Sequence, residues 1–233
     1  MTNRDIQKKA AAEYAVENFV ESGMLVGLGF GSTAIHAVRK LGELIRQGTL
    51  RSITAIACAQ STEDLARELG IPLIDFQTDT VIDITIDGAD EVDPDLNLIK
   101  GGGGALTREK IVAQASRKEV IVIDESKQSQ SLGNQWPVPV EIVPFGWQTQ
   151  IGYLENLGAD PVLRKTENGE PLTTDQGNYI IDANFGPIEQ PLLLGDQIIR
   201  RAGIVEHGLF LQLATDLVVA TADSITHLVK ENN

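Results

Sequence analysis

The first half of the chain alternates between short apolar runs and longer segments with helical periodicity. Ile35, Val38 and Leu41 recur on one face of segment 32–47, which predicts an amphipathic helix. Ser61 and Asp64 have the spacing of a helix N-cap and a following acid, so a second helix is expected to begin at Ser61. The same pattern predicts helices at 61–69 and 107–116, and strands at 24–28, 53–57, 71–74, 81–86 and 120–123. Such alternation indicates an α/β fold, a parallel sheet with helices on its faces.

The rhythm changes after about Leu132, where a turn-rich stretch begins. Beyond it the pattern predicts strands at 138–143, 162–165 and 179–183, and helices at 147–157 and 192–201. Apolar runs at 209–213 and 217–221 are expected to return to the first sheet. We therefore predict a Rossmann-like catalytic domain over residues 1–132 plus 209–233, with a smaller α+β domain inserted over residues 133–208.

The composition fits a soluble globular protein, since 42% of the residues are apolar and 22% are charged. No apolar run approaches the ~20 residues that a membrane-spanning helix needs, and the polar N-terminal segment lacks a signal-peptide core. Cys58 is the only cysteine, so internal disulfides and a cysteine-rich zinc site are excluded, and we expect Cys58 to be a small apolar residue in a strand. We predict a cytoplasmic protein that binds no membrane.

The net charge of −14 argues against a nucleic-acid partner, because nucleic-acid-binding proteins normally carry a basic stripe. It also repels a phosphate on average. Any phosphate site must therefore be a local positive exception, built from lysines and backbone N–H groups.

A glycine-rich loop, residues 27–34, lies between the first predicted strand and helix. Its glycines allow close approach to a ligand, and the helix N-terminus offers unpaired N–H groups to an anion. A plain turn with Ser32 as the helix N-cap is the alternative. Gly29, Gly31 and Ala34 also fit the dinucleotide-binding fingerprint, but no acid follows the second predicted strand to hold a ribose, which disfavours that interpretation.

An acidic cluster, Asp87, Asp90 and Asp93, lies at the C-terminal end of a predicted apolar strand. Acids at this position suit the hydroxyl groups of a sugar or a magnesium or calcium ion. Asp side chains that bond their own backbone in a turn are the third possibility. The spacing does not separate these three interpretations.

A third segment carries a cation and a carboxylate on either side of four glycines. Lys100 precedes Gly101–Gly104, and Glu109 falls in the first turn of the helix that follows. This arrangement suits proton abstraction next to a carbonyl, in which the carboxylate takes the proton and the lysine stabilises the oxyanion. The alternative is a flexible linker followed by a favourable helix-dipole charge.

The other candidate residues carry less weight. His36, His207 and His227 do not pair with Cys or Ser at a suggestive spacing, which disfavours a catalytic triad or a histidine metal site. Trp136 and Trp147 are expected to be packing residues.

Together these segments resemble those of the type A ribose-5-phosphate isomerases. Residues 29–34 resemble the phosphate-side loop of that family, 87–91 and 100–103 match two signature motifs, 106–110 match the segment with the general base, and 124–127 resemble a segment whose lysine contacts substrate. The resemblance extends over essentially the whole chain. It implies an isomerase without metal or cofactor that interconverts D-ribose 5-phosphate and D-ribulose 5-phosphate, in the pentose phosphate pathway or in carbon fixation.

The resemblance also implies roles for residues. Glu109 would be the general base, Lys100 would stabilise the enediolate oxygen, and Asp87 and Asp90 would orient hydroxyls and assist ring opening. The substrate-binding residues that it implies are Lys9, Phe30, Gly31, Ser32, Thr33, Gly88, Ala89, Gly101, Gly102, Gly103 and Lys127. The family's loop usually has Thr where this chain has Phe30, so backbone N–H groups and Ser32 would replace that hydroxyl. A homo-oligomer, dimer or tetramer, is expected as well.

Alternative functions come from neighbouring classes. An amino-sugar phosphate isomerase or deaminase of related fold would use a similar site. A sugar-phosphate-sensing domain would bind without turnover, but it normally follows a DNA-binding segment, and only about 23 residues precede the first predicted strand. A CoA transferase would need a glutamate nucleophile motif, which is not seen.

Overall fold

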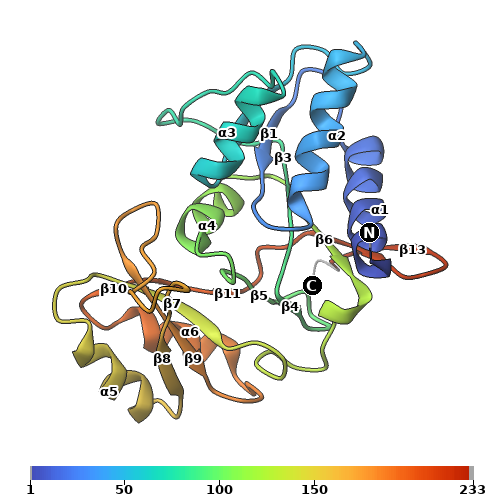
Figure 1. Ribbon diagram of the computed structural model, residues 1–233. Coiled ribbons are helices and arrows are strands. Elements are labelled where there is room, and N and C mark those ends of the chain that lie inside the picture. The colour runs from blue at the N-terminus through green and yellow to red at the C-terminus, as the bar shows by residue number, and fades with distance from the viewer. Residues whose placement is uncertain (1, 231–233) are drawn as a thin grey trace. The chain divides into compact units, whose positions relative to one another are not determined.

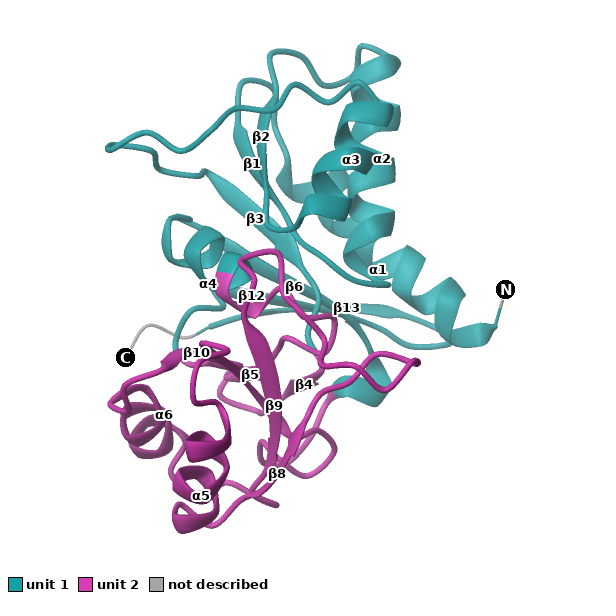
Figure 2. Cartoon of the chain, turned by 60° about the vertical axis from the view of Figure 1, so that its left-hand side comes forward, with its two compact units in different colours: residues 1–89, 108–127, 212–233 teal, residues 90–107, 128–211 magenta. Residues whose placement is uncertain are grey.

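The structure, a computed structural model, describes residues 2–230 and divides into two compact units. Figure 2 colours them separately: unit 1 comprises residues 1–89, 108–127 and 212–233, and unit 2 comprises residues 90–107 and 128–211. Unit 2 is thus larger than the predicted insertion, because the short strands within 90–107 pair with each other and with a strand near residue 209.

Unit 1 is built on a six-stranded sheet in the order β13-β12-β6-β3-β1-β2. The strands are β1 Leu25–Leu28, β2 Thr54–Ala57, β3 Ile84–Asp87, β6 Glu119–Asp124, β12 Asp216–Ala220 and β13 Ile225–Val229. All neighbours pair parallel except β13, which is antiparallel at the edge. The predicted α/β fold with a mainly parallel sheet is confirmed.

Helices cover both faces of this sheet. On one face lie α1 (Asn3–Phe19), α2 (Ala34–Arg46) and α3 (Gln60–Glu68), and Figure 1 shows α1 and α2 side by side. Val26 and Leu28 of β1 join the core beneath these helices. The next helix, α4 (Leu106–Gln114), contributes Val112 to a cluster with Ile56 and Ile82 on the other face. Gly27 of β1 faces this helix, and a Cβ atom added to Gly27 would lie only 2.8 Å from Val112 Cγ1.

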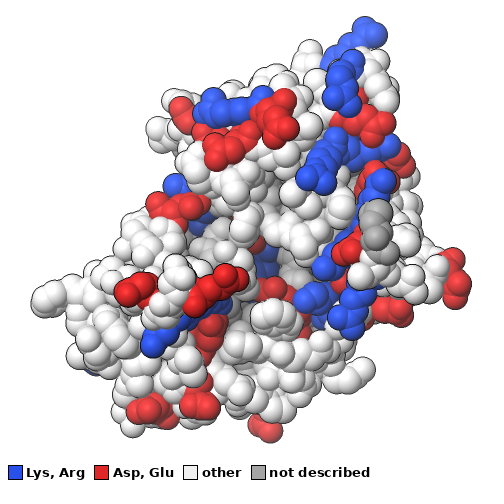
Figure 3. Space-filling model, in the orientation of Figure 1, with Lys and Arg blue, Asp and Glu red and all other residues white. Residues whose placement is uncertain are grey.

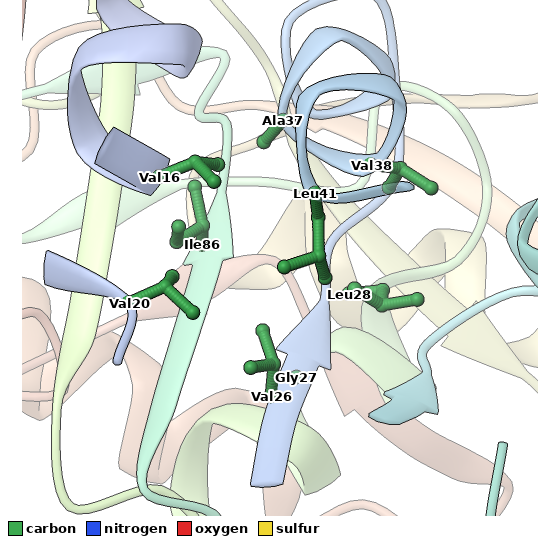
Figure 4. A pocket seen from close by; sticks show the side chains of 9 residues that line it. All are labelled: Val16, Val20, Val26, Gly27, Leu28, Ala37, Val38, Leu41 and Ile86. Atoms are coloured by element: carbon green, nitrogen blue, oxygen red, sulfur yellow. The ribbon is translucent and has the colours of Figure 1, made fainter. Parts of the chain in front are cut away.

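A small apolar void lies where α1 and α2 meet β1 and β3 (Figure 4). Its volume is about 10 Å³. It is lined by Val16, Val20, Val26, Gly27, Leu28, Ala37, Val38, Leu41 and Ile86. A buried water needs at least this much space and two to four polar partners, so the void is a gap in the packing rather than a ligand site.

Unit 2 contains two small sheets. The antiparallel sheet β10-β7-β9-β8 consists of β7 (Val138–Ile142), β8 (Asp160–Leu163), β9 (Tyr179–Asn184) and β10 (Ile204–His207). The second sheet, β11-β5-β4, consists of Leu209–Phe210, Leu98–Ile99 and Glu91–Val92. Two helices, α5 (Gln148–Asn156) and α6 (Pro191–Ile199), complete the unit. Trp136 and Trp147 pack against its apolar core, as predicted.

The pattern analysis misses the first helix, α1, although the chain signals it. Thr2 is the N-cap; its hydroxyl accepts the Asp5 N–H at 3.2 Å, and its own N–H donates to the Asp5 carboxylate at 2.9 Å. This reciprocal capping box matches the Thr2-x-x-Asp5 spacing. Ala11, Ala12 and Ala15 then form the buried stripe of the helix.

Three predicted elements are wrong in detail. Ser61 lies inside α3, which begins at Gln60 with Ala59 at the N-cap position. Residues 71–74 form a single bridge, Ala55 to Leu73, because Pro72 has no N–H to extend the pairing. β11 pairs with β5 instead of returning to the main sheet; only β12 returns, beside β6.

Candidate active site

Three segments of unit 1 follow neighbouring parallel strands. The loop 29–33 follows β1, Asp87 ends β3, and a short 3-10 helix, Glu125–Lys127, follows β6. Since β3 lies between β1 and β6, the carboxyl ends of the three strands meet at one edge of the sheet. Ligands of open α/β sheets bind beyond this edge. The fold therefore places Ser32, Asp87 and Lys127 at neighbouring strand ends, as a binding site requires.

Asp87 fixes the glycine loop from the end of β3. Its side chain is buried, and Oδ1 accepts the N–H of Phe30 at 3.0 Å and that of Gly88 at 2.7 Å. A Cβ atom on Gly29 would lie 2.3 Å from this oxygen, so no larger residue fits there without displacing Asp87. Asp87 is thus a shaping residue of the loop as well as a candidate for substrate contact.

The loop leads into the N-terminus of α2, where several backbone N–H groups are available to a ligand. Thr33 is the N-cap of α2 and makes no side-chain cap bond, so the alternative with Ser32 as N-cap does not hold. Within residues 2–230, the N–H groups of Gly31, Ser32 and Thr33 have no protein acceptor. N–H groups in this position bind anions such as phosphate.

A lysine that the sequence analysis missed contacts this loop. Lys8 Nζ donates to Ser32 Oγ at 3.0 Å, whereas Lys9 Nζ lies 3.7 Å from Glu13 Oε1. Adjacent residues of a helix point in different directions, so only one of the two can face the loop. Figure 3 shows basic side chains, with acidic ones among them, where α1 and α2 lie in Figure 1. The positive charge beside the loop itself comes from Lys8. The role of Lys9 stays a prediction.

Phe30 belongs to the apolar cluster rather than to the polar loop. Its side chain packs against the cluster of Ile56, Cys58 and Val112. Its N–H is already bonded to Asp87. The donors nearest to the place of the missing Thr hydroxyl are therefore the N–H groups that follow Phe30.

In unit 2, the start of the glycine segment is held by its own neighbours. Lys100 is 2% exposed, and its N–H donates to Gly208 O at 2.9 Å. Its ammonium nitrogen lies 5.5 Å from the ring centroid of Phe210, within the range of a cation–π contact. A buried lysine needs such compensation, because the ammonium group has lost most of its hydration.

The four glycines form an ordered turn rather than a flexible linker. Gly104 N–H donates to Gly101 O at 3.0 Å, and both residues have positive φ, +92° and +102°. Asp90 Oδ2 accepts the Gly102 N–H at 2.7 Å. Asp90 therefore positions this turn as Asp87 positions the loop after β1, and Gly103 is the exposed residue of the turn.

The third acid of the cluster has a structural role. Asp93 Oδ1 accepts the N–H groups of Asp95 at 3.0 Å and Asn97 at 2.8 Å, so the turn interpretation holds for this residue. Burial raises the pKa of Asp93, although the bonds from Asn97 oppose that effect. Among residues 2–230, no group of three or more His, Cys, Asp or Glu is arranged to hold a metal ion.

Glu91, beside Asp90, anchors a distant loop. Its side chain is fully buried, and its carboxylate accepts four backbone N–H groups. They belong to Gly133, Asn134, Gln135 and Trp136, at 3.0–3.3 Å. Because Glu91 is in β4, these bonds tie β4 to the turn that precedes β7.

Glu109 lies in the first turn of α4 and is 4% exposed. The residue Thr107, two positions earlier, is tied to Glu141, a fully buried residue of β7. Glu141 also accepts bonds from Thr174 Oγ1 at 2.8 Å and Asn178 Nδ2 at 2.9 Å. The start of the helix that carries the predicted base is thus anchored by a buried carboxylate that sequence reasoning did not single out.

His227 belongs to a separate cluster, at the edge strands of the unit 1 sheet. His227 Nε2 lies 2.6 Å from Asp216 Oδ1, and Lys118 Nζ lies 3.1 Å from the same oxygen. Asp216 begins β12, so this cluster lies at the amino ends of the parallel strands, away from the loops described above. Its role is to tie β13 to β12.

The chain matches proteins of one family throughout its length. The family model described as ribose 5-phosphate isomerase A (phosphoriboisomerase A) matches residues 54–224. A ribose-5-phosphate isomerase A of Desulfatibacillum aliphaticivorans is 52% identical over 98% of this chain and 99% of its own. Ribose 5-phosphate isomerase from Plasmodium falciparum has a similar structure, with TM-score 0.95 and 40% identity over 98% of this chain and 100% of its own.

A second solved structure adds a ligand. It is described as a D-ribose-5-phosphate isomerase in complex with phospho-erythronic acid, and it superposes with TM-score 0.95 at 37% identity over 98% of this chain and 100% of its own. Over the described residues of our chain, no helix combines the length and the apolar character that crossing a membrane requires.

Proposed function

Because the chain belongs to the ribose 5-phosphate isomerase A family, we propose that it interconverts D-ribose 5-phosphate and D-ribulose 5-phosphate. The reaction moves one proton between C2 and C1 of the open-chain sugar, and the carbonyl moves from C1 to C2. No redox partner is required. The intermediate is an enediolate, which needs a base for the proton and a positive group for the oxygen.

Glu109 and Lys100 suit these two tasks. Both side chains are almost fully buried, at 4% and 2% exposed, and this is the observation that carries the assignment. Charged residues are rarely buried to this degree without a specific role or partner. In this proposal Glu109 removes the proton from C2 and returns it to C1, and Lys100 stabilises the negative charge that develops on the oxygen.

The acids Asp87 and Asp90 then have a double function. Each holds the backbone of a glycine segment through one carboxylate oxygen. We propose that these carboxylates also orient the sugar hydroxyls and assist ring opening, with backbone contacts from Gly88, Ala89 and Gly101–Gly103.

The phosphate group is proposed to bind at the N-terminus of α2. The N–H groups of Gly31, Ser32 and Thr33 and the ammonium group of Lys8 support this assignment, because they combine directed donors with positive charge. Lys127, which follows β6, and Lys9 are further proposed contacts. The ligand of the solved relative, phospho-erythronic acid, carries a phosphate group and a carboxylate. We expect it to compete with substrate here.

The decisive assay uses the chain with ribose 5-phosphate and EDTA in heavy water. Formation of ribulose 5-phosphate that carries deuterium at C1 is expected, because a carboxylate base exchanges its proton with solvent. Binding of the sugar phosphate without turnover would identify a sensor. Turnover of an amino-sugar phosphate in its place would identify the related isomerase or deaminase.

We also propose a setting for the enzyme. The substrate points to the pentose phosphate pathway, or to carbon fixation in an organism that has it. A cytoplasmic location is part of this proposal, and so is a homodimer or homotetramer, which is the family's usual assembly. Sedimentation of the purified chain tests the assembly.

A further inference from the structure

Arg164, directly after β8 in unit 2, holds the glycine turn that follows Lys100. Its Nη1 donates to Gly101 O at 2.8 Å and to Gly102 O at 3.1 Å. These carbonyls lie more than 60 positions earlier in the chain. The turn is therefore fixed by a side chain from another part of unit 2, besides its own internal bond between Gly104 and Gly101.

The guanidinium group is itself fixed by Asp182 of β9. Nε donates to Asp182 Oδ2 at 2.9 Å, and Nη2 pairs with Oδ1 of the same carboxylate. A bidentate pair of this kind holds the guanidinium plane in one orientation. The side chain of Arg164 is only 14% exposed. Lysine could not reproduce this arrangement, because its single ammonium group lacks the planar fork that reaches two carbonyls and a carboxylate together.

The contacts control the direction of the peptide groups in the turn. Gly102 is held at both ends: its N–H donates to Asp90 and its C=O accepts from Arg164. A trans peptide directs its N–H opposite to its C=O. The Gly102 carbonyl and the Gly103 N–H belong to one peptide group. With this carbonyl fixed on Arg164, the N–H of Gly103, the exposed residue of the turn, must point away from Arg164.

We propose that Arg164 is a positioning residue of the isomerase reaction. By holding the carbonyls of Gly101 and Gly102, it sets the direction of the Gly103 N–H and the path of the backbone that starts at Lys100. Arg164 acts through the turn and not on the substrate. The proposal rests on the role assigned above to Lys100, and it adds a residue that the motifs do not contain.

The packing against the turn also supports the proposal. A Cβ atom on Gly104 would lie 3.4 Å from Leu172 and 3.7 Å from Ile180, so the segment after β8 and the strand β9 pack against the turn. Loss of Arg164 would leave this packing in place but free the carbonyls of Gly101 and Gly102. The expected consequence is a misdirected peptide group, rather than an unfolded unit.

The test compares Arg164→Gln with Arg201→Gln in the full chain. Arg201 is the matched control, because it also lies in unit 2 and its guanidinium stacks over Tyr153, 5.2 Å from the ring centroid. Misplacement of reacting groups by about 1 Å costs on the order of 10²-fold. We expect Arg164→Gln to lower kcat about 10- to 100-fold, with a smaller change in KM, while Arg201→Gln stays within about 2-fold of wild type.

Two further measurements separate positioning from general stability. Guanidinium ion at non-denaturing concentration should restore part of the kcat of Arg164→Ala, and sodium at equal ionic strength should not. In the background of Lys100→Ala, Arg164→Gln should cost less than about 3-fold, because residues that act through one another are not additive. If Arg164→Gln does not fold, the same tests apply to Arg164→Lys.

The failures are distinguishable. An inactive wild type would overturn the proposed function, and near-normal kcat in Lys100→Ala would overturn the role of that lysine. With both of those intact, a kcat of Arg164→Gln within about 2-fold of wild type would overturn the positioning role. So would a full additional loss in the Lys100→Ala background.

Discussion

The substitution Glu91→Gln should destabilise unit 2 far more than its small change in size suggests. The buried carboxylate accepts four backbone N–H bonds, two on each oxygen. In Gln one oxygen becomes an NH₂ group, so two of these bonds are lost and two backbone N–H groups face a donor. A hydrogen bond contributes about 0.5–1.5 kcal/mol, or about 1.5–3 kcal/mol when one partner is charged, so the loss of two lowers the free energy of unfolding by roughly 1–6 kcal/mol.

The assay is built into the chain. Its two tryptophans, Trp136 and Trp147, are both in unit 2, so tryptophan fluorescence during urea unfolding reports the stability of that unit. Asp95→Asn is the matched control, since it removes the same charge four positions away from an exposed side chain. We expect that control to change the free energy of unfolding by less than about 0.5 kcal/mol. Equal effects of the two substitutions would refute the reasoning, because they would show that the four bonds contribute nothing beyond charge.

Three other predictions follow from the site and the sheet of unit 1. Lys8→Ala should raise KM about 10- to 100-fold, because it removes a charged contact to the phosphate, and Lys9→Ala should raise KM much less. Initial rates over a range of substrate concentrations measure both KM values. The reverse order would assign the phosphate contact to Lys9. Phe30→Thr should lower the free energy of unfolding by about 1–3 kcal/mol, because it removes an aromatic ring from the apolar cluster. It should leave KM within about 3-fold of wild type, because the N–H of residue 30 already bonds Asp87. A markedly lower KM would show that the introduced hydroxyl contacts substrate. Burial alone raises the pKa of Asp216, but bonds from Thr215, His227 and Lys118 outweigh it and hold the pKa below the usual 3.8. The stability that wild type has over Asp216→Asn should therefore be present above about pH 5 and be lost below 3.8, as the pH falls through the lowered pKa of the folded state. Circular dichroism during urea unfolding at several pH values measures this difference, and a pH-independent difference would contradict the assignment.

The sequence predicts those parts of the site that local chemistry determines. Gly29 directly follows β1 and Asp87 ends β3, and parallel strands bring such positions to one edge, so the loop and the acid could be expected together. The motif around Lys100 and Glu109 is likewise continuous in the chain, and its chemistry is recognisable without coordinates. The Asp93 turn could be listed as a possibility but not chosen, because spacing alone does not reveal which donors meet a carboxylate.

The parts that could not be predicted depend on distant contacts. β4, β5 and β11 are strands of only two residues, too short for a periodic pattern. The pairing of β5 with β11, across more than 100 positions, joins residues 90–107 to unit 2. Glu141 lies within β7 and Arg164 directly after β8, both in stretches without a motif, and only the fold shows what they hold. Lys8 and Lys9 differ only in helical phase, and α1 itself was missed.

The central claim is that Glu109 carries the proton. The most direct measurement is the kcat of Glu109→Gln with ribose 5-phosphate, on protein whose circular dichroism and urea midpoint match those of wild type. Loss of a general base typically costs 10²- to 10⁴-fold, so we expect a fall of about that size, together with loss of deuterium incorporation from heavy water. Turnover within about 3-fold of wild type, with deuterium still incorporated, would remove Glu109 from this role.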